Sequence, residues 1–287
     1  MSGPADQLSL LSPDLLRHSP ELVSSFRRLA RATVVGLGWH YLLDLTWIAR
    51  ELGEPANLKV LDAGAGLGVL QWHLAEGGAQ VLSVDRTDRS RLPATVRDQF
   101  RIRGLAPGDL APRIAAWTST KSILRGFAGR IAMRRRPPAK GSVTIHRGDL
   151  DRLDLIPDQS VDVVVSVSAL EHNDPKNLPG LVGELLRVLK SGGRLLATLS
   201  AARGDDWLHV PSKGWCYSEA TLRKAFQISP STPSNWESFE FLFGELAGCE
   251  ELRRGLSWRY RLSGRNGMPW GRWNPTYLPV GVLKVKK

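Results

Sequence analysis

Three glycines at every second position, Gly64, Gly66 and Gly68, stand directly after an apolar run that ends at Asp62. Glycine at such positions lets the backbone turn sharply and come close to a ligand, where a Cβ would clash. Asp85 ends a second apolar run, 21 positions beyond Gly64. In a strand, turn, helix and strand unit, this is where a carboxylate reaches ribose hydroxyls. The spacing therefore predicts a nucleoside-binding site.

The glycine spacing also separates two classes of cofactor. A dinucleotide site prefers the pattern G-x-G-x-x-G, which requires glycine at position 69. The residue there is Val69, and the pattern is D-x-G-x-G-x-G instead. We therefore do not expect a nicotinamide dinucleotide.

Strands and helices alternate in the pattern that surrounds these residues. We expect strands over residues 59–62, 80–85, 142–146, 161–169 and 194–200, with helices over 69–76 and 177–190. The fourth of these strands is almost wholly apolar, as a central parallel strand buried on both faces should be. This alternation predicts an α/β fold with a parallel, doubly wound sheet and right-handed crossovers.

The flanking parts are expected to complete a single domain over residues 1–287. Residues 1–57 look like a helical N-terminal cap, residues 58–200 form the cofactor-binding core, and residues 201–287 hold six of the ten tryptophans. The last part predicts a helix over 218–226 and a final strand over 277–285. His40 and Tyr41 are candidates for lining the pocket, and an ordinary packed aromatic pair is the alternative.

The charge of the chain is concentrated in one insertion. The net charge is +11, and residues 86–140 alone carry 14 Lys/Arg against three acids. The two cysteines predict neither a disulfide framework nor a metal cluster. The start of the chain lacks the features of a signal peptide, and no apolar run reaches the length of a membrane span. We expect a cytoplasmic protein, with peripheral membrane contact left open.

The insertion at 87–141 lies between the second and third strands and exceeds an ordinary crossover. Residues 112–136 within it predict a basic amphipathic helix. Such a helix could cover the site as a cap with a solvated outer face. Alternatively, it could bind an anionic membrane surface or a membrane-linked substrate, nucleic acid, or a protein partner. The sequence does not choose among these, and nothing in it indicates an oligomeric state.

Three stretches resemble class I S-adenosylmethionine-dependent methyltransferases, and within them the type 11 methyltransferase group. They are residues 61–68, residues 148–150 (GDL), and residues 166–174 (SVSALEHND) leading to the Gly192-Gly193 turn. Ser191 replaces the proline usual before that turn. The resemblance implies a Rossmann-like sheet of seven strands, with the last strand antiparallel, and S-adenosylmethionine as the cofactor.

Carried onto this sequence, the resemblance implies roles for individual residues. Gly64, Gly66 and Gly68 would shape the cofactor loop. Asp62 would place the methionine end, and Asp85, with Arg86 beside it, would hold the ribose. Asp149 would hold the adenine amino group, and Leu150 would contact the adenine face. Ser168 would line the site beside the methyl group.

Methyl transfer from a sulfonium mainly requires alignment and exclusion of water, and a general base is needed only when the nucleophile must lose a proton early. The candidate base is His172, beside Glu171 and just after the fourth strand; a structural cap on the following loop is the alternative. His209 is a weaker candidate. We predict no metal site, because Glu171, His172 and Asp174 have no partner cluster elsewhere.

The stretch after the fourth strand lacks the Asn/Asp-Pro-Pro-aromatic sequence of methyltransferases that act on adenine or cytosine amines. The leading hypothesis is therefore methyl transfer to a small molecule, at a hydroxyl of a metabolite, lipid or sugar. The alternatives are an RNA methyltransferase that uses the basic insertion, and a non-catalytic methyltransferase-like membrane or assembly module.

Overall fold

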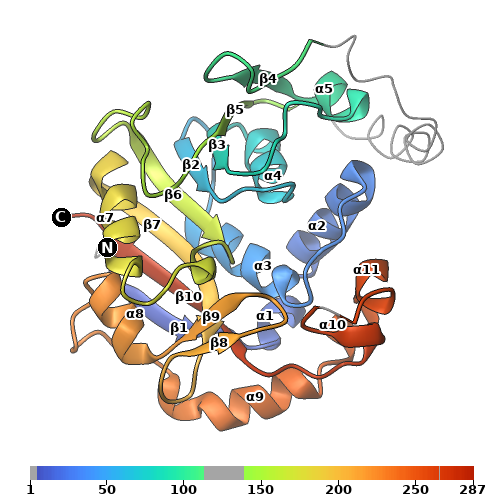
Figure 1. Ribbon diagram of the computed structural model, residues 1–287, viewed down its shortest axis with the longest axis vertical. Coiled ribbons are helices and arrows are strands. Elements are labelled where there is room, and N and C mark those ends of the chain that lie inside the picture. Colours follow the sequence, from blue (N-terminus) through green and yellow to red (C-terminus); the bar gives the residue numbers. More distant parts are fainter. Residues whose placement is uncertain (1–4, 113–138, 265) are drawn as a thin grey trace.

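The computed structural model describes residues 5–112, 139–264 and 266–287. Ten strands of these residues form one mixed sheet with helices on both sides (Figure 1). Apart from its first residue, the basic helix predicted over 112–136 lies outside the described residues. Its interpretations therefore stay predictions.

The sheet has the order β1-β10-β7-β6-β2-β3-β5-β4, and β8 and β9 extend it beside β7. Its longer strands are β2 (Lys59–Ala63), β3 (Gln80–Asp85), β5 (Ser142–Arg147), β6 (Val161–Val167), β7 (Leu189–Ala201) and β10 (Leu278–Val285). Parallel pairing links β5, β3, β2, β6 and β7 in turn. β10 runs antiparallel to β7. The Rossmann-like α/β fold with an antiparallel last strand is confirmed.

The prediction of seven strands is wrong, since ten strands join the sheet within the described residues. Four strands were not predicted: β1 (Gln7–Leu10), β4 (Arg101–Gly104), β8 (Trp207–His209) and β9 (Gly214–Tyr217). None of them is longer than four residues. A run this short is too brief for periodicity to separate it from a loop.

Strand β1 corrects the expectation of a wholly helical N-terminal cap. Leu8 and Leu10 are buried on one face, and β1 pairs antiparallel with β10. Asp6 fixes this register, because its carboxylate accepts hydrogen bonds from the Lys284 ammonium at 2.7 Å and the Val285 amide at 2.9 Å. The first segment therefore becomes the edge of the sheet, and the helical part begins after it.

Helices cover the two faces of the sheet. On one side lie α2 (Pro20–Thr33), α3 (Tyr41–Leu52) and α4 (Leu70–Glu76), after the short α1 (Asp14–Arg17); on the other lie α7 (Leu178–Val188) and α8 (Glu219–Ala225) (Figure 1). Helix α3 contacts β6, β7 and β10, so it crosses the middle of the sheet. Ser218 caps α8, because its Oγ accepts from the Thr221 amide at 3.2 Å. The short helix α5 (Ala94–Gln99) precedes β4.

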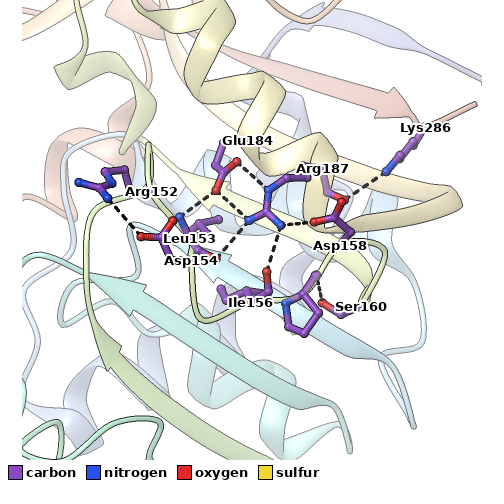
Figure 2. A network of polar contacts seen from close by, with 10 residues as sticks. Arg152, Leu153, Asp154, Ile156, Asp158, Ser160, Glu184, Arg187 and Lys286 are labelled. Atoms are coloured by element: carbon purple, nitrogen blue, oxygen red, sulfur yellow. Dashed lines mark hydrogen bonds and ion pairs between the residues drawn. The ribbon is translucent and has the colours of Figure 1, made fainter.

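The connection from β5 to β6 has neither a helix nor a strand between residues 148 and 160. Figure 2 shows how Arg187 of α7 holds it. The Arg187 guanidinium donates to the carbonyls of Leu153 and Ile156, both at 3.1 Å, and pairs with Glu184 and Asp158. Glu184 also accepts from the Leu153 amide at 2.8 Å. One helix thus supplies hydrogen-bond partners that this loop cannot supply for itself.

The C-terminal part folds over the carboxyl ends of the strands. It contains the β8–β9 hairpin and the helices α9 (Phe239–Ala247), α10 (Glu250–Arg254) and α11 (Trp258–Arg261), with the single turns η3 (Trp236–Ser238) and η4 (Pro269–Gly271). Helices α10 and α11 face α2 in Figure 1. None of the helices in the described ranges has the length and apolar character needed to cross a membrane.

Candidate cofactor and methyl-transfer site

The glycine loop follows β2 and opens α4, as predicted. Gly64 and Gly66 have φ angles of +77° and +48°, in the region that favours glycine. The amides of Gly64 and Ala65 both donate to the Val84 carbonyl, at 2.9 and 3.2 Å. A Cβ on Gly64 would lie 2.2 Å from the Cβ of Ala169. The loop therefore needs glycine at position 64 because of both its conformation and its close approach to the end of β6.

Asp85 lies at the carboxyl end of β3, beside this loop. Its Oδ2 accepts from the Gly66 amide at 2.8 Å, and its Oδ1 accepts from the Thr87 amide at 2.6 Å. Arg89, which is buried, donates to the carbonyls of Ser83 and His146 at 2.8 and 2.9 Å. The carboxylate is thus fixed against the glycine turn, and sequence reasoning missed the arginine that ties β3 to β5.

A cavity of about 180 Å³ opens at the glycine loop, and we call it the cofactor cavity. The loop residues 64–70 line one side. Asp62 lies in its wall and is buried, and burial raises the pKa of this carboxyl to about 7, partly offset by the nearby charge of Arg89. Tyr41 of α3 and Arg259 of α11 line the other side. The cavity therefore presents a carboxyl from the core and a guanidinium from the C-terminal part.

Three predicted residues surround the outer end of the site. Arg86 and Asp149 form an ion pair with each other, and both side chains are more than half exposed. The Gly148 amide donates to the Asp85 carbonyl at 3.1 Å, which brings the two loops together. Leu150 is half-buried, and its Cδ1 lies 3.7 Å from where a Cβ on Gly64 would lie. The structure thus gathers these residues around β3 and β5 but directs Asp149 toward Arg86.

Ser168 follows β6 with a φ angle of +47°, which is uncommon outside glycine. Its hydroxyl donates to Oδ2 of Asp44 at 3.0 Å. The same Oδ2 lies 2.8 Å from Nδ1 of His40, and Nε2 of His40 lies 3.3 Å from the Tyr277 hydroxyl. All four residues are buried. They form a buried polar cluster that joins β6, α3 and the start of β10.

Sequence reasoning named His40 and missed Asp44, which lies four residues further along on the same face of α3. Burial alone would lower the pKa of His40, but the carboxylates of Asp44 and Glu171 raise it above the ordinary value. Glu171 is buried and accepts from Ser200 Oγ at 2.9 Å. Burial raises the pKa of Glu171 to about 7. Glu171 and the cluster together therefore hold two carboxyl groups and one imidazole away from water.

His172 is exposed beside this cluster, on the turn η2 (Leu170–His172). Its Nδ1 lies 3.1 Å from the Lys213 carbonyl. His209 is buried at the edge of the cluster, with its Nδ1 2.7 Å from the Ser212 hydroxyl and its ring against that of Tyr277. Among the described residues, no group of three His, Cys, Asp or Glu side chains could hold a metal ion.

Residues 127–197 match the family model described as a methyltransferase domain. A curated ubiquinone biosynthesis O-methyltransferase from Leptothrix cholodnii is 48% identical over 48 residues. That match spans 17% of this chain and only 20% of the relative's length. The match shows that the two proteins share one similar segment. It is too short to indicate the methyl acceptor of this protein.

Two solved structures illustrate the likeness in fold. A phosphoethanolamine N-methyltransferase 2 from Haemonchus contortus, bound to S-adenosylhomocysteine, has 15% identity and a TM-score of 0.51, covering 95% of this chain and 60% of its own. The YcgJ protein of Bacillus subtilis has 16% identity and a TM-score of 0.44, covering 85% and 99%. The domain match over residues 127–197 supports the predicted class, S-adenosylmethionine-dependent methyltransferase, and the solved structure with a TM-score of 0.51 shows the likeness in fold.

Proposed function

We propose that this protein transfers a methyl group from S-adenosylmethionine to a hydroxyl of a small molecule. The observation that carries the proposal is the glycine loop with Asp85 hydrogen-bonded to the Gly66 amide. This geometry places a carboxylate at the carboxyl end of β3, beside a turn whose backbone can approach a ligand closely. Two vicinal ribose hydroxyls suit such an acceptor.

The charges in the cofactor cavity support the same proposal. The methionine end of the cofactor is a zwitterion, with an ammonium and a carboxylate. Asp62 and Arg259 both line the cavity, one from the core and one from α11. We assign the ammonium to Asp62 and the carboxylate to Arg259, because each charge then meets its opposite in a partly enclosed site. Asp149 and Leu150 would receive the adenine once Asp149 leaves Arg86.

When bound, the cofactor supplies an activated methyl on a sulfonium. The protein's part is to hold the acceptor in line and to exclude water. We assign proton removal to His172. If its Nδ1–H donates to the Lys213 carbonyl, its Nε2 carries the lone pair in the neutral ring and can accept the proton of an acceptor hydroxyl. The backbone hydrogen bond would fix the tautomer needed for a base.

Transfer to oxygen is the finer part of this proposal. The observation that supports it is His172 at the carboxyl end of β6. Methylation of oxygen requires the loss of a proton from the nucleophile, which is the task of a general base. A His172→Gln variant should therefore keep the affinity for the cofactor and lose most of the methyl transfer.

Isothermal titration with S-adenosylmethionine tests the cofactor assignment directly. The wild type should bind, and Asp85→Ala should weaken binding by at least about tenfold, because the ribose then loses a charge-assisted pair of hydrogen bonds. Asp88→Ala is the matched control, since Asp88 is an exposed acid three residues further along. No binding by the wild type, or equal binding by the two variants, would contradict the proposal. A mass-shift screen for one added methylene over metabolite pools then identifies the acceptor.

A further inference from the structure

A second cavity of about 470 Å³ lies beside the cofactor cavity. It runs between α2 on one side and α10 and α11 on the other, and we call it the α2–α11 groove. Three residues, Val35, Gly36 and Leu37, line both cavities. Residues 35–37 are therefore the partition between the groove and the place where the cofactor is proposed to bind.

The walls of the groove are mainly apolar, and its basic charge comes from α2. Trp39 in the turn before α3, Leu42 of α3 and Leu252 of α10 line it. Arg27 is paired with Glu251 at 3.1 Å. Arg31, one turn further along α2, is exposed and has no ion-pair partner among the described residues. An apolar cavity with one uncompensated guanidinium is complementary to a ligand that has an apolar body and a negative charge.

Exposed apolar side chains lie at the rim of the groove. Val34 and Trp258, which both line the cavity, are 52% and 59% exposed. Val34 is the C-cap residue of α2, with a φ angle of +58°. Ser257 also lines the groove, and its hydroxyl oxygen has no hydrogen-bond partner among the described residues. A ligand with an apolar body would cover the two exposed apolar side chains.

We propose that the α2–α11 groove binds an amphiphilic acid. Its apolar body would lie between α2 and α11, and its anionic group would face Arg31. Because residues 35–37 separate the groove from the cofactor cavity, this ligand and the cofactor would occupy neighbouring but separate sites. The affinity of the groove for an amphiphilic anion does not depend on the proposed function.

The test uses the full-length protein and two fluorescent probes of similar shape. Anilinonaphthalene sulfonate is an amphiphilic anion, and phenylnaphthylamine is its neutral counterpart. The anion should bind saturably and stay bound when the cofactor cavity is filled with S-adenosylhomocysteine. Arg31→Gln should weaken binding of the anion by roughly threefold, as expected for one exposed charge pair, and leave the neutral probe unchanged.

Two further variants sharpen the result. Arg28→Gln removes the same charge from α2 outside the groove, because Arg28 bonds Ser24 at 2.7 Å and does not line the cavity; it should leave both probes unchanged. Trp258→Ala should weaken both probes. Displacement of the anion by S-adenosylhomocysteine, or equal effects of Arg28→Gln and Arg31→Gln, would overturn the groove as a binding site. Failure of S-adenosylhomocysteine to bind would instead overturn the proposed function and leave the probe result standing.

Discussion

Replacing Gly64 with alanine tests the most constrained position of the cofactor loop. The new Cβ would lie 2.2 Å from the Cβ of Ala169, where two carbons cannot remain. The φ angle of +77° adds a conformational penalty of about 1–2 kcal/mol for any residue with a Cβ. The steric overlap costs a further 1–3 kcal/mol or so, as overpacking typically does. We expect Gly64→Ala to lower the free energy of unfolding by roughly 2–5 kcal/mol.

Differential scanning calorimetry measures this loss, which should lower Tm by roughly 5–10 °C in a chain of this size. Two other glycines separate the causes. At Gly66 a Cβ would meet only Asp85 at 3.8 Å, so Gly66→Ala should pay the conformational penalty alone. At Gly180, inside α7, a Cβ would meet nothing within 4 Å, and Gly180→Ala should gain up to about 1 kcal/mol.

The double variant Gly64→Ala/Ala169→Gly removes the carbon that the new side chain strikes. The closest remaining contacts of the Cβ are then at 3.7 Å, which is ordinary van der Waals distance. A double-mutant cycle should therefore give a favourable coupling energy of about 1–3 kcal/mol. A Gly64→Ala variant as stable as the wild type, or a cycle without coupling, would refute the close approach of β2 and β6.

Three other predictions concern charged groups. Burial raises the pKa of Asp62 from 3.8 to about 7. The stability that the protonated carboxyl contributes below pH 3.8 is therefore lost as the pH rises to about 7. In urea unfolding, Asp62→Asn should lose less free energy of unfolding between about pH 5 and pH 8 than the wild type, and equal losses would count against a buried carboxyl. Asp44→Asn should lower the pKa of His40 in an NMR titration, because Asp44 raises it; an unchanged pKa would exclude the pairing. Arg187→Ala should lower the free energy of unfolding in urea by about 2 kcal/mol. The control Arg152→Ala, at an exposed arginine, should lower it by no more than about 0.5 kcal/mol. Equal losses would show that Arg187 does not hold the β5–β6 loop.

The parts of the fold that could be predicted are those with strong local signals. Long apolar runs such as β6 must lie inside, whatever surrounds them, and the glycines after β2 require a tight turn. Strands β1 and β4 could not be predicted, because each has only four residues and depends on a neighbour far along the chain. Strand β1 is defined by β10, which begins at Leu278.

The residues of the candidate site follow the same rule. Asp62 and Asp85 could be placed at the site, since each lies at the carboxyl end of a strand within 25 residues of the glycine loop. Asp44 and Arg259 could not, because nothing near them in the sequence indicates which strand end they reach. Asp44 meets Ser168 across 124 positions of the chain, and only the packing of α3 across β6 and β7 brings them together.

Helix α11 connects the two cavities, and this has a consequence for binding. Its neighbouring residues Trp258 and Arg259 line the groove and the cofactor cavity, respectively. If one ligand restricts the motion of α11, the second ligand loses less conformational entropy when it binds to the same helix. We therefore expect S-adenosylhomocysteine to strengthen binding of the anionic probe, and the probe to strengthen binding of S-adenosylhomocysteine by the same factor. Arg259→Gln should weaken this coupling while Arg31 still holds the probe, because the link between the cavities passes through the helix rather than through the partition alone.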